Sequence, residues 1–285
     1  MTLRISALAT LVLLAGCTVA PPRPIAAAVP ADDNLNAVAW TQNAVEHDLI
    51  YLQTYRDAEQ QLAAALADRH WDALTPADRT VPARRLPPAV VLDIDETVLD
   101  NSPYQARLVR VHGQFNEASW EAWCREARAQ ALPGVVAFTR YAAARGIKVI
   151  YISNRATALD DVTLANLRQV GVPVSGPEAV LGLGTAVPGC TPTGSDKGCR
   201  RQWVSHRYRV LMQFGDQLGD FLDIKDNTPA GRTAAAKPYL DWIGRRWFVL
   251  PNPTYGSWEP ALFGNDWHAA PEEKRRRKIE SLRLD

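Results

Sequence analysis

The stretch AVVLDIDETVLDNSPY, residues 89–104, constrains the fold of this chain more than any other. Its apolar run Val90–Ile94 predicts a strand, and Asp93 and Asp95 come at the end of that strand. A charged side chain at the end of a buried strand costs free energy unless a partner or a ligand balances its charge. Side chains two apart on a strand share a face, so we expect both carboxylates to reach one point beyond the strand.

A divalent cation would offset the repulsion between these two carboxylates. Two carboxylates that are close together repel each other unless one is protonated or a cation lies between them. Mg²⁺ is the cation we expect, because it prefers oxygen ligands and tolerates water and phosphate in its coordination shell. The D-x-D pattern alone also fits metal-dependent glycosyltransferases and calcium-binding loops. Other motifs of the chain are therefore needed to distinguish between these functions.

Apolar strands alternate with helices along the middle of the chain. This alternation predicts an α/β fold with a parallel sheet that is covered by helices on both faces. A helical pattern over Leu35–Leu74, with Val45, Leu49, Leu52 and Leu62 on one stripe, predicts an N-terminal helical arm. Tryptophans between residues 103 and 131 indicate a small helical insert after the first core strand. The expected strands are 90–94, 148–153, 179–183, 210–214 and 247–250, and the expected core helices are 134–145, 159–169 and 196–207.

Three further polar motifs follow core strands or lie between them. Ser153 ends the strand in YISNR, Lys197 stands near a helix start in SDKGCRRQ, and Asp216 and Asp220 follow a strand in FGDQLGDF. Ligands of an open parallel sheet bind beyond the carboxyl ends of its strands, where these residues would meet. A hydroxyl and a lysine at a helix N-terminus both favour a phosphate group. Each motif alone could be an ordinary turn or surface residue, so the informative feature is their order.

This order resembles the haloacid-dehalogenase (HAD) superfamily of phosphohydrolases. Together with their flanking residues, LDIDETVLDNSPY, YISNR, SDKGCRRQ, FGDQLGDF and LPNPTYGSWE make the chain similar to the bacterial outer-membrane acid phosphatase and 5′-nucleotidase lipoproteins. These are class C acid phosphatases of HAD subfamily IIIB. The resemblance covers roughly Leu35–Leu262 and implies an HAD-like Rossmannoid parallel sheet with flanking helices.

The resemblance also implies a mechanism that depends on Mg²⁺. Asp93 would attack phosphorus to form an aspartyl-phosphate, and Asp95 would protonate the leaving group and then activate water. The metal ligands would be the Asp93 carboxylate, the Asp95 backbone carbonyl and the Asp216 carboxylate. Asp220 would orient a metal-bound water from outside this set of ligands.

Substrate contacts complete the set of roles that the resemblance implies. Ser153 and Lys197 would hold the phosphate oxygens. In the family two aromatic residues sandwich a nucleobase, and the matching positions are Trp120 in SWEAW and Tyr255 in PTYGSW, with Trp258 near the same wall. The expected substrate is therefore a nucleoside monophosphate or a related nucleotide.

Three other functions stay open at this point. One is a broad acid phosphatase that acts on sugar or aryl phosphates. Another is a binding lipoprotein that uses a phosphatase fold without catalysis, although such a protein need not keep both Asp93 and Asp95. The third is a D-x-D glycosyltransferase, which leaves Lys197 and Asp216 unexplained.

The N-terminus predicts export and lipid anchoring. The run MTLRISALATLVLLAGC has a basic start, an apolar stretch and small residues before Cys17, which resembles a bacterial lipobox with Cys17 as the lipidated residue. A plain signal peptide is the alternative. We expect a protein of the cell envelope that is anchored in the outer membrane and faces the periplasm. The expected segments are a signal peptide (1–17), a Pro/Ala-rich tether (18–33), a helical arm (34–87), the phosphatase core (88–265, with its insert at about 103–131) and a charged tail (266–285).

Charge and cysteine usage add less specific constraints. A formal net charge of +1 gives no indication of nucleic-acid binding, and a homodimer is left open. Cys190 and Cys199 flank a polar loop and predict a local disulfide in an oxidising compartment, whereas Cys124 is expected to be a buried thiol. No cysteine or histidine spacing is typical of a zinc site. The charged tail predicts a solvated helix, with lipid headgroup contact as the alternative.

Overall fold

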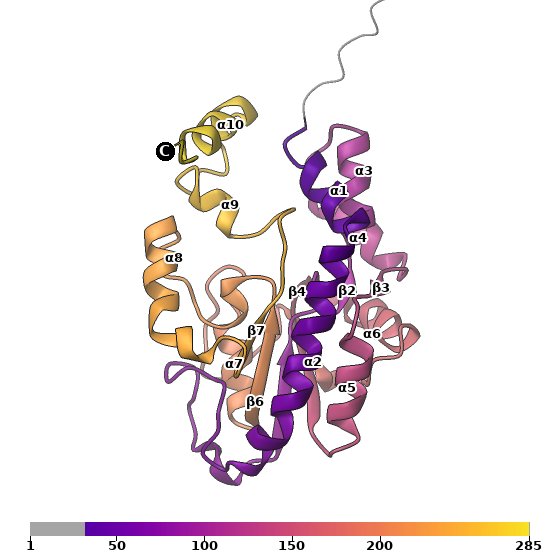
Figure 1. Ribbon diagram of the computed structural model, residues 1–285, viewed down its shortest axis with the longest axis vertical. Helices are drawn as coiled ribbons and strands as arrows, with labels where there is room; N and C mark the ends of the chain where they lie inside the picture. The colour runs from indigo at the N-terminus through magenta and orange to yellow at the C-terminus, as the bar shows by residue number, and fades with distance from the viewer. Residues whose placement is uncertain (1–31, 285) are drawn as a thin grey trace, which may run out of the picture. The chain divides into compact units, whose positions relative to one another are not determined.

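The computed structural model describes residues 32–284 as α-helices and strands around one parallel sheet (Figure 1). The predicted signal peptide, Cys17 and nearly all of the tether lie outside this range. Within it, no helix combines the length and the apolar character that crossing a membrane requires. The sheet has the order β5-β4-β1-β6-β7, and its strands are β1 (Pro88–Leu92), β4 (Lys148–Ala156), β5 (Val180–Leu183), β6 (Arg209–Gly215) and β7 (Trp247–Val249).

The strand β1 lies at the centre of the sheet and is parallel to both of its neighbours. Leu92 is in register with Tyr151 of β4 and with Phe214 of β6. The pairs β4–β5 and β6–β7 are parallel as well. All strands therefore end at the same edge of the sheet, which is the edge where the predicted polar residues lie. The expected α/β fold with a parallel sheet is confirmed.

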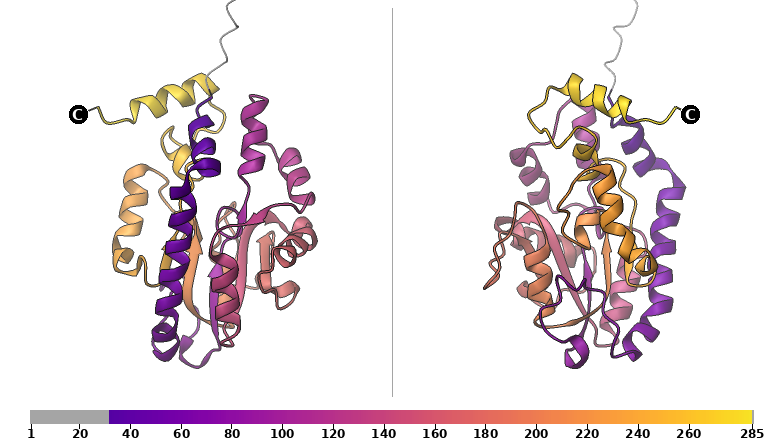
Figure 2. Two further views of the ribbon diagram at one scale, coloured as in Figure 1. Left: turned by 45° about the vertical axis from the view of Figure 1, so that its right-hand side comes forward. Right: turned by 90° about the vertical axis from the view of Figure 1, so that its left-hand side faces the viewer.

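Alternate residues of the strands face two separate apolar cores. Val90 and Leu92 lie in one core, together with side chains of α2 (Val45–Ala67), α5 (Val135–Ala143) and α6 (Asp160–Gln169). Ala89 and Val91 lie in the other core, with Val204 of α7 (Gly198–Ser205). Figure 2 shows the sheet between these two layers of helices. Because both faces are covered, the strands can be apolar throughout, as their sequences indicate.

The N-terminal arm differs from its prediction in extent and in orientation. It consists of α1 (Leu35–Asn43) and α2, which ends at Ala67, so residues 68–74 are not helical. The predicted apolar stripe is wrong at Val45 and Leu49, which are 61% and 54% exposed, whereas Leu62 is buried as predicted. The buried face of α2 also carries Tyr51, Tyr55, Ala58 and Ala65. Both tyrosine hydroxyls donate to carbonyls of the loop after β1, which explains why this face turns inward.

The predicted helical insert contains two helices, α3 (Ser102–Arg110) and α4 (Glu117–Arg125). The short strands β2 (Leu99–Asp100) and β3 (Gln130–Ala131) pair in antiparallel fashion and close its base. Figure 1 shows both helices beyond the upper ends of the sheet strands, and α9 (Trp258–Ala261) lies beyond the same end, across from them. Segments distant in sequence thus surround the edge at which the strands end.

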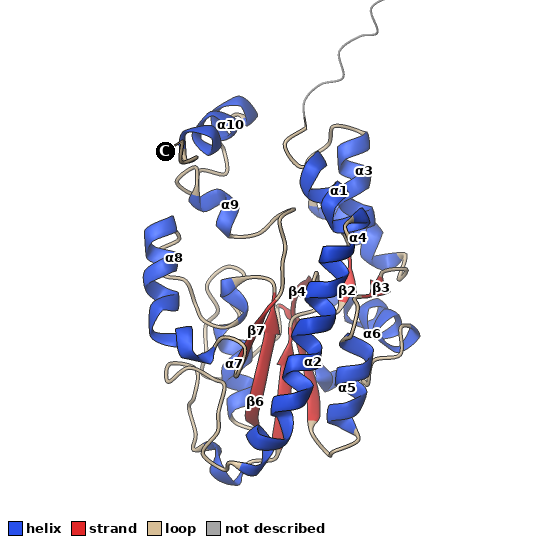
Figure 3. Cartoon of the chain, in the orientation of Figure 1, coloured by secondary structure: helices blue, strands red, loops and turns tan. Residues whose placement is uncertain are grey.

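The remaining elements follow the prediction to within a few residues, with some additions (Figure 3). The charged tail forms α10 (Pro271–Glu280), which has no buried residue but forms ion pairs with Asp33 through Arg275 and Lys278. The helix α8 (Pro229–Ala236), the 3₁₀ segment Lys237–Trp242 and α9 were not expected. The strand β1 ends at Leu92, two residues before its predicted end, and this changes the geometry of the site.

Candidate metal and phosphate site

Three aspartates from two neighbouring strands converge at the carboxyl edge of the sheet. Asp93 follows β1, and Asp216 and Asp220 follow β6. One carboxylate oxygen from each lies within 4.8 Å of the others. Asp93 is 6% exposed, Asp220 is 8% exposed, and Asp216 is partly exposed. This cluster is a candidate site for a divalent cation, since carboxylate oxygens are ligands that Mg²⁺ prefers.

Local backbone geometry brings these carboxylates together. The Asp93 backbone N–H donates to the Phe214 carbonyl at 2.9 Å, so the two strand ends stay paired beyond β1. At Gly215 a Cβ atom would lie 2.2 Å from the Asp220 Oδ2 atom, so only glycine lets this side chain fold back over the strand end. The Gln217 backbone N–H donates to Asp220 Oδ2 at 2.8 Å. The Gln217 side chain donates to Asp216 Oδ2 at 2.7 Å.

Lys197 is the cation that the chain itself supplies to this cluster. It is 4% exposed, and its ammonium group contacts Asp93 Oδ1 and lies 2.7 Å from Asp220 Oδ1. It also donates to the Ile152 carbonyl at 2.8 Å. Burial lowers the pKa of Lys197, but the charges of Asp220 and Asp93 outweigh this and raise it above its ordinary value. Lys197 is therefore charged and fixed at the end of the sheet.

The charge balance of the cluster fits a divalent cation. Three carboxylates against one ammonium leave two formal negative charges, which a divalent ion would balance. Burial raises the pKa of Asp93 well above its ordinary value, Lys197 opposes this rise, and Asp220 and Asp216 add to it. Burial and the neighbouring Asp220 raise the pKa of Asp216 to about 7. Ionised carboxylates are thus disfavoured here without further positive charge.

Asp95 does not direct its carboxylate at this cluster, in contrast to the expectation that it would converge with Asp93. The strand has ended at Leu92, and the chain turns sharply so that the Leu99 and Val98 N–H groups both donate to the Ile94 carbonyl at 2.8 Å. Glu96 adopts a left-handed conformation with φ 56° in this turn. The Asp95 carboxylate instead contacts Arg155, Asn101 and Ser153.

Ser153 and the segment that carries Lys197 are connected through Arg200. Ser153 is fully buried, and its hydroxyl donates to Asp95 Oδ2 at 3.2 Å. Arg200 donates to the Ser153 carbonyl and, at 3.0 Å, to the carbonyl of Ser195, which precedes Lys197. Burial lowers the pKa of Arg200 to about 10. This arginine ties the loop before Lys197 to the end of β4.

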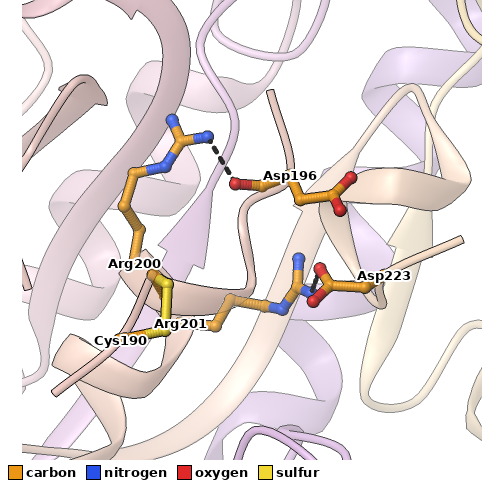
Figure 4. The surroundings of a disulfide bond; sticks show 6 residues. Cys190, Asp196, Arg200, Arg201 and Asp223 are labelled. Carbon is orange, nitrogen blue, oxygen red and sulfur yellow. Dashed lines mark hydrogen bonds and ion pairs between the residues drawn. A yellow bond between two sulfur atoms is a disulfide. The ribbon is translucent and has the colours of Figure 1, made fainter. Parts of the chain in front are cut away.

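The predicted disulfide is confirmed and lies at the start of α7. Cys190 and Cys199 are bonded with a Cα–Cα distance of 5.6 Å, and Cys199 is two residues from Lys197. Figure 4 shows the disulfide beside Arg200 and Arg201. Arg201 is fully buried and donates to Asp78 Oδ2 at 2.8 Å. The disulfide and the two arginines therefore hold the segment that carries Lys197.

The two aromatic residues predicted to bind the nucleobase, Trp120 and Tyr255, each contact a charged residue at or near the loop after β1. The Tyr255 hydroxyl donates to Glu96 Oε2. The Trp120 ring packs at 5.2 Å from Tyr104 and lies 5.5 Å from the guanidinium of Arg155. The indole of Trp258 donates to the Tyr255 carbonyl at 3.2 Å. Both Trp120 and Tyr255 are partly exposed.

Several side chains at the site were missed by the sequence analysis. Asn252 donates to Asp216 Oδ2 at 2.8 Å, and the Glu96 carboxylate accepts from the Asn101 N–H at 2.7 Å. Arg155 is 2% exposed beside Asp95. All of them lie within the quoted motifs, next to residues that were singled out. Their position inside a motif was the signal that could have identified them.

The chain belongs to the acid phosphatases of HAD subfamily IIIB. Residues 25–258 match the family described as "HAD superfamily, subfamily IIIB (Acid phosphatase)". The class C acid phosphatase from Bacillus anthracis with tungstate bound is 34% identical, and the match covers 88% of this chain and 97% of that chain with a TM-score of 0.76. A second structure of the class C acid phosphatase from Bacillus anthracis matches with a TM-score of 0.74.

Plant proteins are more distant relatives. A stem 31 kDa glycoprotein of Glycine max is 28% identical over 169 residues, which is 58% of this chain and 58% of that protein. Acid phosphatase 1 of Solanum lycopersicum is 26% identical over 165 residues, covering 58% of this chain and 57% of that protein. The matches to these curated relatives thus span less than two thirds of their length. The predicted family and the predicted fold are both confirmed.

Proposed function

We propose that this chain is a metal-dependent phosphomonoesterase that hydrolyses nucleoside monophosphates or related nucleotides through an aspartyl-phosphate. One observation carries the proposal: Asp93, Asp216, Asp220 and Lys197 form a cluster, buried except for the partly exposed Asp216, at the edge where the parallel strands end. In a family of acid phosphatases, this cluster supplies a nucleophile, metal ligands and a cation for the phosphate.

The residues divide the reaction into two steps. The Asp93 carboxylate attacks phosphorus and is later regenerated by water, while Asp95 gives a proton to the leaving oxygen and takes one from that water. Lys197 and the Ser153 hydroxyl hold the phosphate oxygens. The Asp93 and Asp216 carboxylates and the Asp95 backbone carbonyl would hold a divalent cation, for which we propose Mg²⁺, and Asp220 would orient a metal-bound water. When bound, this ion neutralises negative charge on the phosphoryl group.

A tetrahedral oxyanion is the ligand chemistry that this site suits. The Bacillus anthracis structure is described with tungstate bound, and tungstate has the shape and charge of phosphate. The nucleotide preference rests on Trp120 and Tyr255, because stacking on aromatic side chains contributes about 1–3 kcal/mol per base. A broad acid phosphatase for sugar or aryl phosphates is the rival proposal, since the cluster by itself recognises only the phosphate.

Phosphate release by the purified protein tests this proposal. The substrates are AMP, nicotinamide mononucleotide and an aryl phosphate, each assayed with Mg²⁺ and with a chelator. We expect release that requires the metal and falls by at least 10²-fold in Asp93→Asn. The matched control is Asp241→Asn, an exposed residue that should leave release unchanged. A folded wild-type protein that releases phosphate from none of the three would overturn the enzymatic proposal and favour the binding lipoprotein.

We also propose that Cys17 is lipidated and anchors the protein to the outer membrane, facing the periplasm. The support is the lipobox-like sequence before Cys17 and the disulfide Cys190–Cys199, which is typical of an oxidising compartment. Metabolic labelling with a radioactive fatty acid tests it. Label is expected in the wild-type protein and lost in Cys17→Ala, and an unlabelled wild-type protein would contradict the anchor.

A further inference from the structure

Arg155 is a buried charge at the site to which the roles above assign nothing. It is 2% exposed near the end of β4, between the exposed Asn154 and the partly exposed Ala156. Its Nε atom donates to Asp95 Oδ1 at 2.9 Å, and its Nη2 atom lies 2.8 Å from the same oxygen. Burying a guanidinium costs several kcal/mol unless its partners are well placed. The pair therefore restricts the orientation of the Asp95 carboxylate.

The surroundings of Arg155 fix its direction. Its Nη2 atom donates to Asn101 Oδ1 at 3.2 Å, and Asn101 Oδ1 also accepts from the Trp123 indole at 2.8 Å. The ring of Trp120 lies 5.5 Å from the guanidinium, within the range of a cation–π contact. Asn101 and the tryptophans of the helical insert therefore hold the guanidinium of Arg155 in place.

The two oxygens of Asp95 differ strongly in their contacts. Oδ1 is contacted by Arg155 and also accepts from the Asn101 side-chain amide at 2.9 Å. Among residues 32–284, Oδ2 accepts one hydrogen bond, from the Ser153 hydroxyl at 3.2 Å. N–H donors stabilise negative charge on the oxygen that accepts them, and so a proton on this carboxyl group is favoured on Oδ2. Oδ2 is also the oxygen that faces Ser153, which is a proposed phosphate contact.

We propose that Arg155 is a positioning residue that makes Asp95 exchange its proton through Oδ2, an inference that rests on the proposed function. In the first step the bond between phosphorus and the leaving oxygen breaks, and its electron pair stays on that oxygen. The proton moves from Asp95 Oδ2 to the same oxygen while Asp93 bonds to phosphorus. Asp95 is left as a carboxylate, and Arg155 stabilises this charge at Oδ1.

This role predicts a dependence on the leaving group that a purely structural role would not produce. A basic leaving group needs its proton as the bond breaks, whereas a weakly basic one departs without help. Phenyl phosphate and p-nitrophenyl phosphate share the aromatic ring but differ in the basicity of the leaving group, because phenolate is more basic than p-nitrophenolate. The quantity to compare is kcat/KM, because it reports the steps up to departure of the leaving group and excludes hydrolysis of the phosphoenzyme.

The experiment measures kcat/KM for both substrates in wild type, Arg155→Met and Arg155→Lys, with thermal unfolding as a check of folding. The control is Arg209→Met, another buried arginine (5% exposed), which binds the Asp68 carbonyl at 2.7 Å at the opposite end of the sheet. We expect Arg155→Met to lower kcat/KM for phenyl phosphate at least 10-fold more than for p-nitrophenyl phosphate. Arg155→Lys should fall between wild type and Arg155→Met, and Arg209→Met should affect both substrates equally.

The outcomes separate this inference from the proposed function. Equal losses on the two substrates in the Arg155 variants, with an active wild type, would overturn the positioning role and leave the phosphatase proposal standing. Should Arg155→Met fail to fold, the same substrate ratio in Arg155→Lys decides, and a ratio equal to that of wild type overturns the inference. A wild type that hydrolyses neither ester would overturn both proposals.

Discussion

The metal-free protein should lose stability as pH rises, because its carboxylate cluster lacks balancing charge. Burial, followed by the charge of Asp220, raises the pKa of Asp216 to about 7, although hydrogen bonds from Gln217 and Asn252 oppose this rise. In the unfolded chain the ordinary value is 3.8. The folded state therefore binds a proton at Asp216 that the unfolded chain has already released. Stability from this group is present at low pH and is lost as pH rises toward the folded value.

The size of this loss follows from the difference between the two pKa values. A shift of roughly three units corresponds to about 4 kcal/mol, and partial exposure of Asp216 makes this an upper bound. Part of it is already lost at about pH 5, which leaves about 2–3 kcal/mol to be lost between about pH 5 and about pH 8. Asp216→Asn removes the ionisable group while keeping nearly the same shape, so it should escape this loss.

Urea unfolding followed by tryptophan fluorescence, in the presence of a chelator, measures the effect. The free energy of unfolding of Asp216→Asn minus that of wild type should rise by about 2–3 kcal/mol between about pH 5 and about pH 8. Saturating Mg²⁺ should recover most of the wild-type loss, since a ligand at 100-fold its Kd contributes about 2.7 kcal/mol. Asp241→Asn, at an exposed position, should show no such trend. A difference that stays constant with pH would refute the reasoning.

Three further predictions concern stability and thiol chemistry. Arg201→Met should lower the free energy of unfolding, measured by urea titration, by about 3–5 kcal/mol. The reason is that it leaves the buried Asp78 carboxylate without its guanidinium partner at 2.8 Å. A loss below about 1 kcal/mol would contradict this prediction. Burial raises the pKa of Cys124 to about 12, so its thiol should react with a disulfide reagent only after unfolding, and rapid labelling of the native protein would argue against its burial. Replacing Cys190 and Cys199, which are nine residues apart, with serine should cost about 2–3 kcal/mol, and an unchanged melting temperature would contradict this.

The sequence was sufficient to place the candidate site because its position depends mainly on topology. Parallel strands end at one edge of their sheet, so Asp93, Ser153 and Asp216 were expected at the same edge once the strands were recognised. Lys197 joins them from the N-terminus of α7, where the prediction placed it. The local disulfide was also predictable, because its cysteines flank a single short loop.

Side-chain directions were less predictable than positions. The buried face of α2 is defined by Tyr51 and Tyr55, whose hydroxyls bond to carbonyls of a loop that the helix sequence cannot reveal. Asp95 turned away from Asp93 because the strand ended early and Glu96 adopted φ 56°. The burial of Arg155 required partners from the loop after β1 and from the insert, so the YISNR motif alone could not predict it.

The most direct test of the account is the detection of phosphate on Asp93. The protein is mixed with a ³²P-labelled phosphate ester and Mg²⁺, quenched in acid within the first turnover, and digested into peptides. The account predicts label in the peptide that contains Asp93, with none in Asp93→Asn and undiminished labelling in Asp241→Asn. Turnover of the ester with no labelled peptide, or with label on a different residue, would contradict the assignment of Asp93 as the nucleophile.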